Sequence, residues 1–188
     1  MSVANIIKNR RATPPRLFSK KSLPKATIQA LLESANWAPN HKKTEPWRFK
    51  VYEGKAKAKL AAGARNILLH KQQEGYPVAL EKIEKFASTL ERVPVVIAVV
   101  LQRDTAERIP EWEEVAAVSM AVQNMWLTAT ELNLAAFWAT PAFTELFDEL
   151  LELGEHQKSL GFFYAGEVMM DYPSPGRGDL DKKVEWKH

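Results

Sequence analysis

Residues 37–49, WAPNHKKTEPWRF, hold two tryptophans, two prolines and several charged or polar donors within thirteen positions. A helical apolar pattern ends near Trp37 and an alternating strand pattern begins at Trp47, so we expect a loop between them. Loops between regular elements are where rigid scaffolds display working side chains. A flat aromatic at each end, with basic donors between, suits a planar, anionic ligand. The same composition also fits a proline-stiffened connector whose tryptophans fill the core.

Outward from this loop, the apolar periodicity predicts an α+β fold, in which helices cover a modest sheet. We expect one domain over residues 1–168, followed by a C-terminal arm over residues 169–188 that lacks any helical or strand period. The β-branched run at 94–101 is typical of a strand buried on both faces. The predicted helices span 3–11, 24–37, 55–73, 78–90, 111–133 and 144–153, and the predicted strands span 47–52, 94–101, 135–139 and 161–168.

The predicted helix at 24–37 has a start signal in the sequence. We expect Ser22 to cap this helix and Pro24 to occupy its first position.

The helix at 111–133 is apolar nearly all round, which indicates a core helix or a subunit-contact helix. We expect its acidic pair, Glu113 and Glu114, to form a solvated first turn rather than an acid–base couple.

The composition excludes several classes of site. The chain has 188 residues, 26 basic against 23 acidic side chains, and a net charge of +3. No cysteine is present, so disulfides, iron–sulfur clusters and thiolate nucleophiles are excluded. The histidines at 41, 70, 156 and 188 lack metal-ligand spacing, and we expect no metal site. The N-terminus lacks a signal-peptide core and the longest apolar run is too short to span a bilayer, so we expect a cytoplasmic protein.

A second polar cluster, Asn9-Arg10-Arg11-Ala12-Thr13, follows the first predicted helix. Adjacent guanidinium groups with a nearby hydroxyl can clamp a phosphate, because each offers a planar fork of donors. A solvated basic helix end is the alternative. The chain has no phosphate-cradling glycine loop, so any bound phosphate must be held by side chains.

These pieces together resemble the flavin-dependent nitroreductase family over most of the chain, and its compact, YdjA-like members in particular. Residues 9–12 are similar to the family's opening Arg-Arg-Ser motif, and residues 38–49 to its Ala-Pro-Ser…Gln-Pro-Trp-x-Phe motif. Four further segments are similar to parts of the family pattern. Val93-Pro94-Val95-Val96-Ile97 resembles its core strand, and residues 121–127 resemble its central helix. Phe137-Trp138-Ala139-Thr140 resembles its short flavin-side segment, and residues 160–166 resemble its late strand that ends in glycine.

The resemblance implies a three-layer fold with a central, mostly antiparallel mixed sheet. It also implies a homodimer with FMN at the interface, a C-terminal arm exchanged between subunits, NAD(P)H as electron donor and a ping-pong reaction. Arg10 and Arg11 would meet the flavin phosphate, with Ala12 in the serine position of the motif. Trp37, His41 and Lys43 of one subunit would lie near the flavin ring. Trp138, Ala139 and Thr140 of the other subunit would contact the same ring. Arg177 in the arm would add a positive charge at the flavin phosphate.

The chain departs from the family pattern at two of these positions. Ala12 replaces the motif's serine, and Thr13 is the nearest hydroxyl that can substitute for it. Lys43 stands where many members carry asparagine near the flavin pyrimidine. A cation there can stabilise the anionic reduced flavin; a side chain that points to solvent is the alternative. Hydride transfer through a flavin needs no protein acid, base or nucleophile, so we name no catalytic residue.

The leading hypothesis is therefore an NAD(P)H oxidoreductase that reduces nitroaromatics, quinones or similar flat acceptors. A non-redox alternative is a basic module that binds nucleotides or single-stranded nucleic acid, since bases stack on exposed aromatics. A third reading keeps the flavin but assigns it other chemistry, such as reductive dehalogenation or flavin breakdown.

Overall fold

The computed structural model describes residues 1–170, 172–173 and 176–187. Four strands form one sheet in the order β1-β2-β4-β3, and every pairing within it is antiparallel. The strands are β1 (Trp47–Tyr52), β2 (Val95–Gln102), β3 (Leu134–Ala139) and β4 (Gln157–Glu167).

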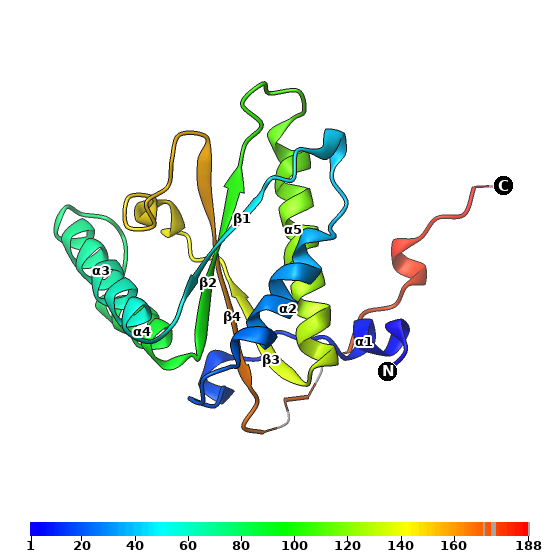
Figure 1. Cartoon of the computed structure of the whole chain (residues 1–188), viewed down its shortest axis with the longest axis horizontal. Helices are drawn as coiled ribbons and strands as arrows, with labels where there is room; N and C mark the ends of the chain where they lie inside the picture. Colours follow the sequence, from blue (N-terminus) through cyan, green and yellow to red (C-terminus); the bar gives the residue numbers. More distant parts are fainter. Residues whose placement is uncertain (171, 174–175, 188) are drawn as a thin grey trace.

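Helices cover both faces of this sheet, which gives three layers (Figure 1). One face carries α2 (Lys25–Asn36) and α5 (Glu111–Glu131), and the other carries α3 (Gly54–Gln73) and α4 (Leu80–Arg92). The short α1 (Val3–Asn9) lies beside the later part of α5. The expected α+β, three-layer fold is confirmed.

β2 explains how one sheet supports two cores. Its residues alternate between the faces, with Val95, Ile97, Val99 and Leu101 in the core beneath α2 and α5, and Val96 and Ala98 in the core beneath α3 and α4. Every residue from Val95 to Leu101 has no exposed surface, as the β-branched run predicted. β2 is therefore a buried central strand; the edge strand β1 pairs with it directly, and the edge strand β3 pairs with β4.

Several helix boundaries differ from the predictions. The expected helix at 144–153 is only a 3₁₀ turn, Thr144–Phe147, in which Phe147 is buried. Pro24 is the cap residue of α2 rather than its first helical residue, and no side chain caps that end. Three further 3₁₀ turns are Pro15–Leu17, His41–Lys43 and Asp181–Lys183.

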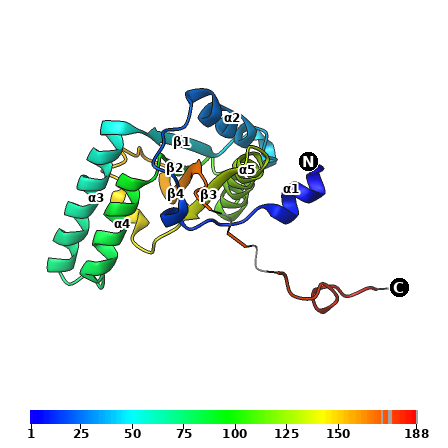
Figure 2. The same cartoon turned by 90° about the horizontal axis from the view of Figure 1, so that it is seen from below.

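The C-terminal arm leaves the domain beside β3 and α1. Figure 2 shows its last part extending away from the layers, with exposed Leu180, Val184 and Trp186. Residue 171, residues 174–175 and residue 188 of the predicted arm lie outside the described residues.

Candidate functional site

Arg10 and Arg11 lie where α1 ends, and α5 orients both. The Arg10 guanidinium carbon is 4.8 Å from the centre of the Trp126 ring, a cation–π contact. The indole Nε1 of Trp126 donates a 3.0 Å hydrogen bond to the carbonyl oxygen of Arg11. One half-buried tryptophan on α5 therefore fixes the backbone of one arginine and the side chain of the other.

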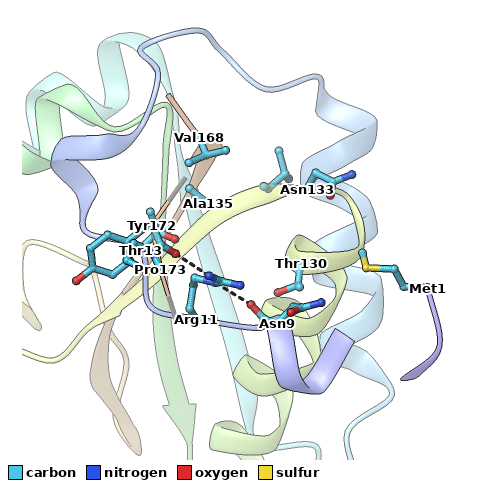
Figure 3. A pocket seen from close by; sticks show the side chains of 11 residues that line it. Met1, Asn9, Arg11, Thr13, Thr130, Asn133, Ala135, Val168, Tyr172 and Pro173 are labelled. Carbon is cyan, nitrogen blue, oxygen red and sulfur yellow. Dashed lines mark hydrogen bonds between the residues drawn. The ribbon is translucent and has the colours of Figure 1, made fainter. Parts of the chain in front are cut away.

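The Arg11 guanidinium points into a cavity of about 610 Å3 between α1, the start of β3 and the base of the arm (Figure 3). Its Nε donates to the Asn9 carbonyl at 2.9 Å and its Nη1 donates to the Tyr172 carbonyl at 2.6 Å. Neither Arg10 nor Arg11 forms an ion pair within the described part of the chain. The cavity therefore carries positive charge that no carboxylate there neutralises.

Arg177 adds to this charge. Burial lowers the pKa of the Arg10 guanidinium, and the nearby positive charges of Arg177 and Arg11 lower that pKa further. Arg11 and Arg177 therefore each repel Arg10 in the folded chain. A bound anion would relieve that repulsion, so Arg10, Arg11 and Arg177, the arginine cluster, form an anion site by charge.

Ala12 and Thr13 differ in exposure. Ala12 is exposed, whereas Thr13 is 5% exposed, lines the same cavity as Arg11 and donates its backbone N–H to the Ala136 carbonyl at 3.0 Å. The one hydroxyl of this segment therefore lies at the arginine cluster, although the motif position itself is alanine.

The loop of residues 37–49 uses its two tryptophans differently. Trp47 is 5% exposed and its Nε1 donates to Asn36 Oδ1 at 3.2 Å, so it fills the core as the connector reading predicted. Trp37 is 78% exposed and its Nε1 bonds to Glu33 Oε1 at 3.2 Å on the same helix. Trp37 thus remains available to a ligand or a partner.

His41, Lys42 and Lys43 form a tight turn at the start of α5. Lys42, Lys43 and Glu45 have positive φ angles of 51°, 54° and 43°, a conformation that costs energy for residues other than glycine. His41 Nδ1 lies 2.6 Å from Glu113 Oε2, and Lys42 Nζ donates to the Arg108 carbonyl at 3.2 Å. These two contacts hold the strained turn against α5 and the segment that precedes it, and Lys43 is left exposed.

Trp138 and Ala139 end β3, and Thr140 follows it. The Trp138 indole Nε1 donates to the Leu160 carbonyl at 3.0 Å, which fixes the half-buried ring against β4. Trp138 and Thr140 line a shallow cavity of about 280 Å3 together with Val115 of α5. Beside them, Gly161 has a φ of +101°, and a Cβ there would lie 2.2 Å from the Ala139 carbonyl oxygen.

These predicted residues fall into two groups in one chain. The arginine cluster lies beside β3, because Thr13, which follows Arg10 and Arg11, donates a backbone hydrogen bond to Ala136. Trp138, Ala139 and Thr140 lie further along the same strand and just past its end. Four residues of extended chain, about 13 Å, separate Ala136 from Thr140. His41 contacts Glu113, whereas Arg10 contacts Trp126, thirteen residues and about 20 Å further along α5. The turn that holds His41 and Lys43 is therefore well separated from the arginine cluster of the same chain.

Two residues that shape the site were missed from the sequence, and one prediction was wrong. Trp126 and Glu113 were not expected to touch Arg10 and His41, although an aromatic and an acid on the longest helix were available signals. Glu114 was expected to be solvated but has no exposed surface. It accepts the Asp104 backbone N–H at 2.8 Å and lies 2.9 Å from Arg103 Nη1, which makes it a structural ion-pair residue.

Two features are absent from the part of the chain that the structure describes. No cluster of three or more histidine, aspartate or glutamate side chains in that part of the chain is arranged to hold a metal ion. None of the helices described there is both long and apolar enough to cross a membrane.

The model of the nitroreductase family matches residues 7–167, and the chain belongs to this family. Over 135 residues it is 37% identical to YfhC of Bacillus subtilis, which is provisionally named an NAD(P)H nitroreductase. That match covers 71% of this chain and 66% of YfhC, so the chain spans just under two thirds of that relative.

Solved structures extend the match to nearly the whole chain. A nitroreductase-like family protein from Bacillus cereus is 29% identical, with a TM-score of 0.85 over 99% of this chain and 96% of that one. A provisionally named nitroreductase from Desulfovibrio desulfuricans, solved in complex with FMN, is 22% identical, with a TM-score of 0.73 over 100% of this chain and 98% of that one. This second likeness shows the fold.

Proposed function

We propose that this chain is an FMN-dependent NAD(P)H oxidoreductase that reduces nitroaromatics, quinones or similar flat acceptors by two electrons in a ping-pong reaction. The observation that carries the proposal is the adjacent pair Arg10 and Arg11, held in place by Trp126 and without an ion pair in the described part of the chain. Family membership supports a flavin as the anion. It also favours this function over a basic nucleic-acid-binding module.

The residues present fit the phosphate of FMN. Arg10 and Arg11 offer guanidinium forks, and the Thr13 side chain lies in the same cavity. Arg177 brings a third charge from the arm. Trp138, Ala139 and Thr140 continue the same edge along β3, so they would hold the part of the cofactor beyond its phosphate.

Bound FMN supplies hydride transfer, accepting from NAD(P)H and donating to the acceptor. The chain's own contribution is to bind, orient and supply a positive field. Lys43 is exposed on the strained turn, and its cation would stabilise negative charge on the cofactor ring. His41 keeps Nε2 free to face the ring, because Glu113 holds Nδ1. We assign no catalytic residue.

We propose that two chains build the site. His41 contacts Glu113 and Arg10 contacts Trp126, about 20 Å further along α5, and this separation supports a cofactor held between two subunits. We propose that Trp37, His41 and Lys43 come from the partner subunit of a homodimer. The α5 face formed by Trp112, Ala116 and Met120 supports this, since Trp112 is 69% and Met120 39% exposed at helical spacing.

We further propose that the C-terminal arm, residues 169–188, wraps the partner. Its exposed Leu180, Val184 and Trp186 are apolar side chains that a second subunit would cover. We propose a cytoplasmic location, where NAD(P)H is available.

The absorbance spectrum of the purified protein tests the proposed activity. We expect a yellow protein with the bands of oxidised flavin, which NADH or NADPH bleaches and a quinone or nitroaromatic restores. A colourless protein that takes up no added FMN would contradict the proposal.

Light scattering over a concentration series tests the dimer. Met120→Glu should place a charge in the α5 contact, dissociate the dimer and lower flavin content. Leu80→Glu on α4, also at an exposed apolar position, is the matched control and should remain dimeric.

A further inference from the structure

A second basic cavity lies on the opposite side of the sheet from α5. It has a volume of about 960 Å3 and lies between the 3₁₀ turn Pro15–Leu17, α3 and α4. Five cationic side chains line it: Arg16, Lys20, Lys57, Lys85 and Arg92. Glu91 is the one carboxylate among the described residues that line it, and Glu53 also acts on Lys57, so five cations face two carboxylates and the basic groove keeps a net positive charge.

The basic groove is built into the pattern of α4. Lys85, Ser88, Thr89 and Arg92 follow the spacing i, i+3, i+4 and i+7, which places them on one helix face. The opposite face of α4 presents Ile83, Ala87 and Leu90 to the core. Packing of the apolar face therefore fixes the direction in which the cationic face points.

Two of the cations are held in place and partly withdrawn from water. Arg92 Nη2 donates to the Arg16 carbonyl, while Arg92 Nε is buried and has no hydrogen-bond partner among the described residues. Lys57 Nζ donates to the Val93 carbonyl, and burial lowers the pKa of this ammonium although Glu53 and Glu91 oppose the shift. These contacts hold Arg92 and Lys57 in place at the wall of the groove, so less side-chain freedom is lost when an anion binds beside them.

We propose that the basic groove binds a small organic ligand that carries two or more phosphate groups, of the size of a nucleoside diphosphate. Arginine forks and lysine ammonium groups are the side chains that bind phosphates. The volume lies within the range of small-molecule sites. Pro14 and Pro15 supply apolar surface for the organic part of the ligand.

This site is separate from the arginine cluster and does not depend on the proposed flavin chemistry. The groove lies in the layer of α3 and α4, whereas Arg10 packs on α5 in the other layer. A dimer formed through α5 would therefore leave the groove accessible. The same chain segment links both places, since residues 10–11 belong to the cluster and residues 14–16 line the groove.

Isothermal titration calorimetry of the full-length protein in excess FMN tests the proposal, with inorganic pyrophosphate, ADP and adenosine as probes. We expect pyrophosphate and ADP to bind one per chain and adenosine not to bind. The double variant Lys20→Gln/Lys85→Gln changes two exposed cations of the groove and should weaken ADP binding by roughly tenfold. Lys55→Gln/Lys82→Gln makes the same change in net charge on α3 and α4 outside the groove and should leave the affinity unchanged.

Three results would overturn the proposal. One is the absence of pyrophosphate and ADP binding at millimolar concentration. Another is equal weakening by the two double variants, which would indicate a general effect of net charge. The third is adenosine binding as tight as that of ADP, which would show that the phosphates are not recognised. Circular dichroism of both variants verifies that each is folded.

Discussion

Gly161→Ala tests whether the end of β3 is held in the shape that the structure shows. Gly161 has a φ of +101°, and a Cβ at this position would lie 2.2 Å from the Ala139 carbonyl oxygen and 3.2 Å from Thr140 Cα. The left-handed backbone costs an alanine about 1 kcal/mol. Relief of the backbone clash adds about 2 kcal/mol, because residues 139–140 must move. We expect the free energy of unfolding to fall by about 3 kcal/mol, measured by urea denaturation.

Gly75→Ala is the matched control for this experiment. Gly75 has a nearly equal φ of +94°, yet a Cβ there would meet nothing within 4 Å. It should therefore lose only the roughly 1 kcal/mol of backbone strain. If the two variants lost equal stability, the close approach of Gly161 to Ala139 would be refuted. Gly161→Ala should also weaken FMN binding, since it displaces two proposed cofactor residues, whereas Gly75→Ala should not.

Three further predictions concern polar groups of the core and its rim. Tyr164→Phe should raise the free energy of unfolding, measured in urea, by about 1 kcal/mol. The Tyr164 hydroxyl is buried without a hydrogen-bond partner among the described residues, and burial raises the pKa of this hydroxyl. A loss of stability would instead show that the hydroxyl forms a hydrogen bond. Glu114→Gln should cost about 3 kcal/mol, because the largely buried Arg103 would lose its charge partner; an unchanged unfolding midpoint would contradict that role. Arg108 holds the pKa of Asp104 at about 2, below the unfolded value of about 3.9, so this pair stabilises the fold above pH 4 and loses its effect as the pH falls through 2. The difference in melting temperature between wild type and Asp104→Asn should accordingly shrink from pH 5 to pH 2, and a constant difference would exclude the ion pair as its cause.

Much of the fold followed from local patterns. The β-branched run at 94–101 predicted a strand buried on both faces, and β2 has that burial because α2 and α5 cover one face and α3 and α4 the other. The helix predicted at 144–153 failed for a tertiary reason. Phe147 and Leu151 are buried in the core beneath α3 and α4, and the chain reaches those positions through a 3₁₀ turn and further hydrogen-bonded turns rather than a regular helix.

The candidate site was less accessible from sequence. The Arg10-Arg11 pair was visible as an anion clamp, but its support by Trp126 depends on a contact across 116 positions of chain. Glu113 and Glu114 are adjacent in sequence, yet one bonds His41 near the surface and the other is fully buried beside Arg103. Adjacent residues on a helix point about 100° apart, and only the surrounding elements determine which of the two faces solvent. The basic groove likewise joins residues 14–20, α3 and α4, which no local pattern connects.

The central claim is that the arginine cluster holds the phosphate of FMN, and a comparison of FMN with riboflavin tests it most directly. The two ligands differ only in that phosphate. Two charged hydrogen bonds of about 1.5 kcal/mol each predict that FMN binds about 100-fold more tightly. In Arg10→Gln/Arg11→Gln this preference should fall to the small part that Arg177 supplies, with riboflavin affinity unchanged. Equal affinities of the wild-type protein for FMN and riboflavin, or a preference undiminished by the double substitution, would contradict the claim.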